Sequence, residues 1–445
     1  MSRLPKNHPL RDQQDLSHFH PIARGPFAQV FSAVQEVGTS AEKRLLRYIA
    51  VPSHPFALKR ERDLLRYLNQ FSQSFPHLYE VRQAGLGILQ IFQFVGQKNL
   101  QKRVQEQGAL SEKEVWRLLR EMVQTLSHVH QVGFVHGDIK PENIVCGEED
   151  FYLIDWSQAM PAKRCFETEK LIGDKRYSPP ERLQGIYTEK SDLFSLGCTL
   201  FFALTGQPLF PIDKEASAIE KLYRLAMNEA QGLDSLPLFW QRLIAHLVQK
   251  EPKLRPSLEE VKRCMENQTI LPALPASAIP SEDLDEVPHE VQKMIEVLAQ
   301  QGFAYAKFKQ AVVLESQGEA LLSIELYQEV AEQGYSRAMN NLGKLLIEKG
   351  QFKQGEQWLK QALKMQNPYA AYNLAYFHQK AKLNSENEKV VSWLKFSAWH
   401  GYLKAQTTYG QWLQQQGKTE DGEYWLKLAA IRGDQEAKQL LSALT

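Results

Sequence analysis

The spacing of apolar and polar residues divides the chain into a first part with both strands and helices and a last part with helices only. Short apolar runs bounded by turn residues predict strands in three regions, residues 21–34 (two strands joined by a turn), 44–49 and 77–95. Apolar residues at helical spacing predict a helix over residues 112–131. Ser111, followed by Glu114 three residues later, supplies the capping box that starts such a helix.

From residue 291 onward a helical pattern repeats with a period in the low thirties. Four similar pairs open the repeats 32, 35 and 32 residues apart: Leu326-Tyr327, Trp358-Leu359, Trp393-Leu394 and Trp425-Leu426. An alanine follows each pair twelve residues later: Ala338, Ala370, Ala405 and Ala437. Such a period is typical of paired antiparallel helices stacked as a solenoid. We therefore predict an all-α solenoid of helix-pair repeats over residues 291–445, with the tryptophans in its core rather than in a ligand site.

Polar and proline-rich segments mark the other domain boundaries. Residues 1–17 are rich in His, Gln and Asp, which predicts a mobile N-terminal arm. Residues 266–290 hold four prolines among Ser, Asp and Glu, which predicts a semi-extended linker. The segment between them, residues 18–265, is then one domain that contains both strands and helices.

Composition changes this picture little. The chain has 445 residues, room for two or three domains, and its 53 basic and 52 acidic residues give no indication of a nucleic acid partner or an acidic membrane surface. The four cysteines lack the spacing of a metal site or a disulfide framework. No apolar run approaches the ~20 residues of a membrane span. We therefore expect a cytoplasmic protein with no membrane span.

The stretch from Phe134 to Trp156, FVHGDIKPENIVCGEEDFYLIDW, carries the candidate chemistry. Two short apolar runs end in acidic residues, Asp138 and Asp155. Phosphoryl transfer needs a carboxylate that accepts a hydroxyl proton and ligands that hold magnesium against the phosphates. Asp138 suits the first task, and Asn143 and Asp155 suit the second. Lys140 could neutralise charge on the phosphoryl group in transit.

This stretch resembles the catalytic and metal-binding loops of eukaryotic-type protein kinases, H-R-D-x-K-x-x-N followed by D-F-G. Gly137 stands in place of the arginine, and Trp156 and Ser157 stand in place of the phenylalanine and glycine. Both variants also resemble small-molecule kinases of the aminoglycoside phosphotransferase type, whose loops read H-G-D and I-D-W. The stretch alone therefore indicates a phosphotransferase of either kind.

Three later motifs resemble protein kinases and not the small-molecule kinases: Ser178-Pro179-Pro180-Glu181, Asp192-Leu193-Phe194-Ser195-Leu196-Gly197 and Arg255-Pro256. The resemblance implies that Asp192 bonds to the backbone near His136 and that Arg255 pairs with Glu181. In the family, the arginine that Gly137 replaces reads a phosphate on the activation segment, so phosphorylation of Thr168 is not expected to be needed.

The fold class that the resemblance implies is an α+β two-lobed protein-kinase-like domain over residues 18–265, followed by an all-α solenoid of helix-pair repeats. Residues 291–445 resemble tetratricopeptide-like repeats of the SEL type, which bind proteins.

On the nucleotide side, Gly25 and Val30 match the central glycine and the valine of the kinase glycine-rich loop. Ala23 and Ala28 stand where the family has its outer two glycines, and Phe27 stands at the loop tip. An added methyl group makes the close approach of backbone N–H groups to phosphates harder without preventing it.

Two residues compete for the place of the strand lysine that pairs with a helix glutamate. Lys59 belongs to a string, Phe56-Ala57-Leu58-Lys59, that looks like the family motif. However, Glu61 precedes an apolar stripe that predicts a helix from about His54, capped by Ser53. Arg47, on a predicted strand fourteen residues before Glu61, is therefore preferred, with Lys59 exposed on the helix.

The resemblance implies a serine/threonine protein kinase that uses ATP and Mg2+, with repeats that recruit a protein substrate and protein partners. Lys140 is the choice of serine/threonine-type kinases. A pseudokinase scaffold is the alternative, because Ala23, Ala28, Arg47 and Ser157 depart from the family pattern. A small-molecule phosphotransferase is a third hypothesis.

Overall fold

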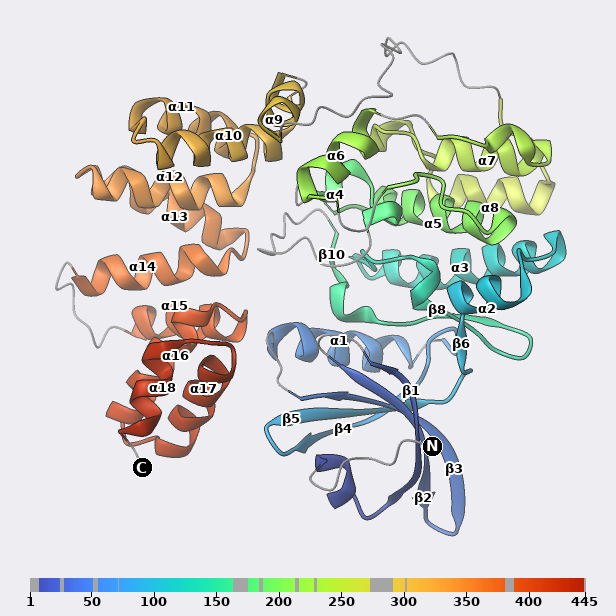
Figure 1. The fold of residues 1–445 in the computed structure, drawn as a ribbon, viewed down its shortest axis with the longest axis horizontal. Coiled ribbons are helices and arrows are strands. Elements are labelled where there is room, and N and C mark those ends of the chain that lie inside the picture. The colour runs from blue at the N-terminus through green and yellow to red at the C-terminus, as the bar shows by residue number, and fades with distance from the viewer. Residues whose placement is uncertain are drawn as a thin grey trace. The chain divides into compact units, whose positions relative to one another are not determined.

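The computed structural model describes residues 8–24, 28–50, 55–70, 72–162, 175–183, 187–212, 216–227, 230–272, 291–300, 302–380 and 388–443. These residues belong to two compact units, one made of residues 1–97 and 368–445 and the other of residues 98–367. Figure 1 labels most of their helices and strands.

A five-stranded antiparallel sheet forms the N-terminal part of the first unit, with the strand order β1-β2-β3-β5-β4. Its strands are β1 (Leu16–Arg24), β2 (Gln29–Val37), β3 (Ser40–Ile49), β4 (Leu78–Ala84) and β5 (Gly87–Gln93). One helix, α1 (Pro55–Leu68), follows β3 in the chain and packs against β4. The strands and the helix that the apolar pattern predicted in this region are confirmed.

The prediction of a mobile arm over residues 1–17 is wrong for residues 8–17. A 3-10 helix, η1 (Pro9–Asp12), leads directly into β1. Leu10 is completely buried and, with Leu16, joins the core of the sheet beside Phe31 and Leu46. Leu10 and Leu16 are isolated apolar residues in a polar segment. They form no periodic pattern that would have predicted their place in the core of the sheet.

The second unit begins with two small sheets and the helices that pack around them. The strands are β6 (Lys98–Asn99), β7 (Phe134–Val135), β8 (Ile144–Cys146), β9 (Phe151–Leu153) and β10 (Met160–Pro161). The helices are α2 (Leu100–Gln107), α3 (Glu112–Gln131), α4 (Pro180–Leu183), α5 (Glu189–Thr205), α6 (Ala218–Met227), α7 (Leu238–Leu247) and α8 (Leu258–Asn267). The predicted capping box of α3 is confirmed, since the Ser111 and Glu114 side chains each accept from the other residue's backbone N–H.

Helix α5 is buried almost all round, which makes it the central helix of this part of the unit. Helix α8 ends at Asn267 with Gln268 as its C-cap, so it includes the first two residues of the segment 266–290.

The rest of the second unit consists of helices α9 (Val291–Gln300), α10 (Ala304–Ser316), α11 (Ala320–Glu332), α12 (Ser336–Glu348) and α13 (Phe352–Lys364). Within this unit each helix packs against the one that follows it, and α9 also packs against α6. The helical region is therefore attached to the preceding domain by a helix contact as well as by the chain.

The first unit also contains helices from this C-terminal region: α14 (Pro368–Lys380), α15 (Glu388–Trp399), α16 (Leu403–Gln415), α17 (Thr419–Ile431) and α18 (Gln435–Ser442). They too stack in sequence order. The predicted fold class, an α+β domain followed by stacked helix pairs, is confirmed. None of the helices in the described parts of the chain is long and apolar enough to cross a membrane.

Glycines allow close helix crossings in this region. An ideal Cβ on Gly343 would lie 2.8 Å from the Gly355 carbonyl oxygen, so α12 and α13 meet backbone to backbone. Gly410 and Gly422 repeat this contact between α16 and α17, where the corresponding distance is 3.0 Å. The four recurring alanines are fully buried, as the repeat pattern predicted.

The tryptophans fit the prediction only in part. Trp425 is buried, but Trp358 and Trp393 are half-buried. The leucine that follows each of the three is buried.

Candidate active site

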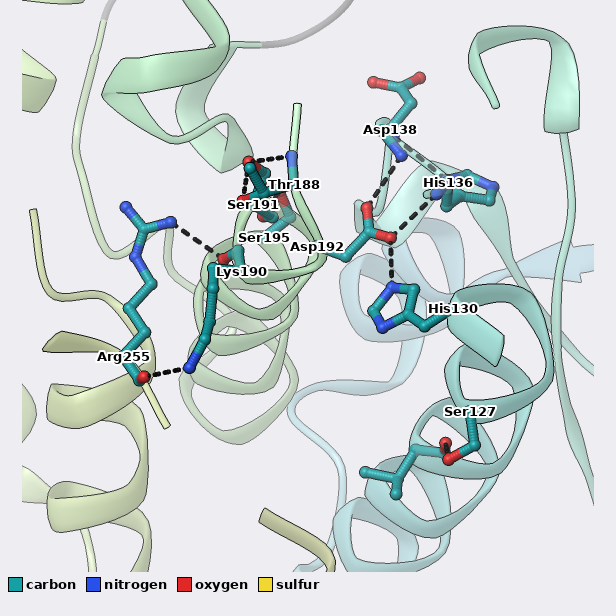
Figure 2. A network of polar contacts seen from close by, with 12 residues as sticks. Ser127, His130, His136, Asp138, Thr188, Lys190, Ser191, Asp192, Ser195 and Arg255 are labelled. Atoms are coloured by element: carbon teal, nitrogen blue, oxygen red, sulfur yellow. Dashed lines mark hydrogen bonds and ion pairs between the residues drawn. The ribbon is translucent and has the colours of Figure 1, made fainter. Parts of the chain in front are cut away.

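The loop after β7 is fixed by one buried carboxylate. Asp192, near the start of α5, accepts hydrogen bonds from the backbone N–H groups of His136 and Gly137, both at 2.9 Å. The Nε2 atom of His130 lies 2.9 Å from the same carboxylate (Figure 2). Burial alone would raise the pKa of Asp192, but the hydrogen bond from His130 and the backbone donors outweigh it and lower the pKa. The predicted contact between Asp192 and the backbone near His136 is confirmed.

The loop brings together three of the predicted site residues. Lys140 Nζ lies 2.7 Å from Asp138 Oδ2, and Asn143 Nδ2 donates to the same oxygen at 2.9 Å and to the Asp138 carbonyl at 2.8 Å. Figure 2 shows the Asp138 carboxylate directed away from Asp192. Burial would raise the pKa of Asp138, but the Lys140 ammonium and the Arg182 guanidinium lower it to about 2. Asp138 is therefore ionised at neutral pH.

Asp155 follows β9 and is joined to the loop through the backbone. The N–H of Ile154 donates to the Asn143 carbonyl at 2.8 Å, and His136 Nε2 lies 3.1 Å from the Ile154 carbonyl oxygen. Asp155 itself has φ 60° and ψ 70°, the left-handed region that non-glycine residues adopt at some energetic cost.

Trp156 replaces the phenylalanine of the family without disturbing this arrangement. Its ring is buried and packs edge-on against His136, with ring centroids 4.5 Å apart. Its indole N–H donates to the Leu153 carbonyl at 3.2 Å, so the extra polar atom of tryptophan has a partner.

Asn143 and Asp155 supply donors that suit Mg2+, which binds hard oxygen ligands and retains several waters. A dedicated protein cage for a metal would need more ligands. Within the described ranges, no group of three or more His, Cys, Asp or Glu residues could hold a metal ion. An amide and a carboxylate fit an ion that completes its coordination with phosphate oxygens and water.

A second buried ion pair joins Glu181 on α4 to Arg255. Arg255 Nη1 and Nη2 donate to Glu181 Oε1 and Oε2 at 2.6 and 3.0 Å. The Ser191 hydroxyl donates to the same carboxylate at 2.9 Å, and the guanidinium lies 4.9 Å from the Phe194 ring centre. The predicted Glu181–Arg255 pair is confirmed.

Arg182 is a residue of this site that the sequence did not reveal. Its Nη1 atom lies 3.5 Å from Asp138 Oδ1, and its side chain is buried. No spacing rule could have found it, since a charged residue directly after a motif is ordinarily exposed.

In the N-terminal sheet, Arg47 on β3 forms an ion pair with Glu61 on α1. Its Nε also donates to Gln90 Oε1 at 2.6 Å, and Gln90 in turn donates to Glu61 at 3.4 Å. Lys59 is exposed and pairs with Asp63 at 3.0 Å. The preference for Arg47 over Lys59 as the partner of Glu61 is confirmed, and Gln90 is a third member that sequence reasoning missed.

The glycine-rich loop can be described only in part. Val30 on β2 is half-buried and lies opposite Arg47 in the strand register. Ala23 is exposed on β1, opposite Val30 on the other side. Gly25 and Phe27 lie outside the described residues, as do Ser53, Thr168 and residues 171–174.

Comparison with known proteins agrees with this geometry. Residues 16–265 match the family described as the protein kinase domain. An Aurora kinase of Schizosaccharomyces pombe is 29% identical over 263 residues, which is 55% of this chain and 68% of that protein. A probable serine/threonine-protein kinase of Clostridium acetobutylicum is 24% identical over 240 residues, 53% of this chain and 36% of that protein.

A third relative, the serine/threonine-protein kinase PknA of a Nostoc species, is 30% identical over 185 residues, 38% of this chain and 32% of that protein. The chain thus spans about a third of the length of the two bacterial proteins.

Proposed function

Because the chain belongs to the protein kinase family, we propose that it transfers the γ-phosphoryl group of ATP to serine or threonine hydroxyls of proteins. One observation carries this proposal: Asp138, Lys140 and Asn143 form a single hydrogen-bonded group. That group combines a carboxylate, a cation and an amide, which are the parts that phosphoryl transfer requires.

In this proposal Asp138 accepts the proton of the attacking hydroxyl. Lys140 holds the Asp138 carboxylate and stabilises negative charge on the phosphoryl group. Asn143 and Asp155 hold Mg2+, which neutralises phosphate charge when it is bound. The Asn143 amide N–H group is already used on Asp138, so its amide oxygen is the atom suited to the metal.

We propose that Gly25, Val30, Arg47 and Glu61 bind the nucleotide. A guanidinium reaches phosphates with a planar fork of donors, whereas an ammonium acts as a point charge. Glu61 and Gln90 both contact the Arg47 guanidinium. They would therefore fix the direction of the fork, which lets an arginine serve where the family has lysine.

We further propose that the C-terminal helix pairs recruit a protein substrate or a regulator, in the manner of tetratricopeptide or SEL-type repeats. Stacked helix pairs supply an extended surface, which supports this role. Since α9 packs against α6, a truncation that tests recruitment should keep α9 and remove only the residues after Gln300. Capture of the purified partner should be lost while transfer to a generic substrate remains.

The test of the main proposal is phosphate transfer by the purified full chain, with labelled ATP, Mg2+ and a generic basic protein. Asp138→Asn should lower the rate by about 10²–10⁴, the contribution of a positioned general base. Lys59→Ala is the matched control, because Lys59 is exposed and forms a surface ion pair with Asp63. Labelled serine or threonine should be recovered from the product.

Equal transfer by the wild type and Asp138→Asn would contradict the proposal. Nucleotide binding without any transfer by the wild type would instead favour the pseudokinase scaffold, which the departures at Ala23, Ala28 and Arg47 suggested.

A further inference from the structure

Arg182 occupies an unusual place for an arginine. It lies on the short helix α4, and its side chain is only 5% exposed. Removing a guanidinium from water is costly unless a negative charge and hydrogen-bond acceptors compensate it. The neighbours of Arg182 therefore indicate what the residue does.

Arg182 forms an ion pair with the proposed base itself. Arg182 Nη1 lies 3.5 Å from Asp138 Oδ1 and 3.3 Å from the Ser178 hydroxyl oxygen. The carboxylate next to it in the sequence, Glu181, is held by Arg255. Asp138 is thus the carboxylate with which Arg182 forms an ion pair.

The two oxygens of Asp138 consequently face two different cations. Lys140 contacts Oδ2 from within the loop, whereas Arg182 approaches Oδ1 from α4. A carboxylate that has one cation at each oxygen cannot rotate about its side-chain bonds without losing one of the two attractions. The pair of cations therefore fixes the plane of the group.

Gly137 and Tyr187 complete the arrangement. The Tyr187 ring lies 5.4 Å from the Arg182 guanidinium. A Cβ on Gly137 would lie 3.4 Å from that ring, an ordinary van der Waals contact, and 3.3 Å from the Gln158 carbonyl oxygen. Gly137 has φ +73°, so the backbone conformation is what favours glycine at this position.

We propose that Arg182 is a positioning residue for phosphoryl transfer: it holds Oδ1 of Asp138 from the end of the activation segment, and it does so without any phosphate group. This inference rests on the proposed kinase function. It extends that function by naming the residue that orients the base in a chain with glycine at position 137.

Removing the guanidinium should free one oxygen of the Asp138 carboxylate. Lys140 still contacts Oδ2, whereas Oδ1 loses the cation that approaches it from α4. The carboxylate can then rotate away from the orientation that the proposed proton transfer needs.

The first experiment measures kcat and KM for ATP of the full chain for the wild type, Arg182→Met and Arg182→Lys. In Arg182→Met kcat should fall at least about tenfold with little change in KM for ATP, because orientation affects the transition state.

Arg182→Lys should restore much of kcat, and it also serves if Arg182→Met folds poorly. Arg120→Met, on the exposed face of α3, should behave as the wild type. An unchanged kcat in Arg182→Met would overturn the proposal.

A second experiment needs no activity. Urea unfolding midpoints of Asp138→Asn, Arg182→Met and the double variant form a cycle that isolates the interaction of the two residues. Each single variant leaves a buried charge with one partner fewer, so the double variant should lose less stability than the sum of the two losses. Additive losses would refute the ion pair. If the wild type fails to transfer phosphate but the cycle shows coupling, the kinase function fails while the link between Arg182 and Asp138 stands.

Discussion

The catalytic loop and the C-terminal helix pairs are fixed by opposite kinds of interaction. Around the loop, buried charges do most of the positioning: Asp192 accepts two backbone N–H groups, and Arg255 pairs with Glu181. Between the helices, close contacts are made by residues with no side chain, such as Gly343 against Gly355. The loop depends on complementary charges, whereas the helix pairs depend on glycines, which have no side chain to keep the two backbones apart.

This difference predicts how substitutions should destabilise each region. A buried ion pair that loses one member leaves an uncompensated charge, which destabilises strongly. A glycine contact fails when a methyl group is added, and the neighbouring helices can relax in part by moving apart. Damage to the loop should therefore be larger and more local than damage to the helix pairs.

The largest expected effect is at Arg255. Arg255→Met should lower the free energy of unfolding by about 3–5 kcal/mol, because Glu181 is left buried without its partner. Urea denaturation measures the loss. Glu181→Gln combined with Arg255→Met should recover part of it, and a double variant no more stable than Arg255→Met would show that the charge of Glu181 is not the cause.

Glycine substitutions should cost less and should follow a rank order. A Cβ on Gly355 would lie 2.4 Å from the Gly343 carbonyl oxygen, whereas on Gly422 its nearest neighbours are the flexible Gln414 side chain and the Gly410 carbonyl oxygen, both at 2.8 Å. Overpacking costs about 1–3 kcal/mol, and the better helix propensity of alanine offsets up to about 1 kcal/mol.

We expect Gly355→Ala to lower the thermal unfolding midpoint more than Gly422→Ala. The reverse order, or stabilisation by both, would show that these helix pairs are not closely packed. Phosphate transfer to a generic substrate should change little in either variant.

The partly exposed ion pair between Asp15 and Arg82 should have a smaller effect on stability than the buried pair. Hydrogen bonds from Arg82 lower the pKa of Asp15 to about 2, from a model-peptide value of 3.8. Because the folded-state pKa is depressed, the stability this pair contributes is present above pH ~4 and is lost as the pH falls towards about 2. After allowance for solvent screening, Asp15→Asn should cost about 1 kcal/mol at pH 7.

Unfolding of the wild type and Asp15→Asn should therefore be compared across this range, and the difference between them should shrink as the pH falls below 4. A constant difference would mean that Asp15 contributes through packing rather than charge. The same variant tests whether residues 8–17 are held in place, since Asp15 joins that segment to Arg82 on β4.

The smallest effect should be at Lys59. Its side chain is 57% exposed and its ion pair with Asp63 is a surface pair. Such a pair is worth about 0.3–0.5 kcal/mol, so Lys59→Ala should change stability and transfer very little. Arg47→Ala should lower both, because Glu61 is buried. Loss of activity in Lys59→Ala alone would contradict the assignment of Arg47.

What the sequence predicted, and what it could not, follows from the range of the interactions. Helix α3 was found with its bounds because its stripe and its capping box are local. The Arg47–Glu61 and Glu181–Arg255 pairs were found because fixed spacing or family motifs identify both members. Arg182 was missed because its contact with Asp138 depends on how α4 packs on the loop. No local sequence pattern predicts that packing.

The other differences have the same origin. Leu10 completes the core of the sheet through contacts with distant strands, so a polar local sequence concealed it. The repeat pattern shows which positions recur, but it does not show which of two neighbouring apolar residues faces inward. Leu359 and Leu394 are buried, whereas Trp358 and Trp393 remain half-exposed to solvent.

The left-handed backbone of Asp155 places fold stability and the proposed reaction in opposition at one residue. Glycine would adopt φ 60° without the steric cost that aspartate bears, so Asp155→Gly would relieve backbone strain while it removes the proposed metal ligand. Selection for stability alone would therefore let aspartate drift away from this position. A lineage that gave up phosphate transfer and kept only the scaffold would be expected to lose Asp155 early, so the residue found there in each descendant is a record of whether the chemistry was still in use.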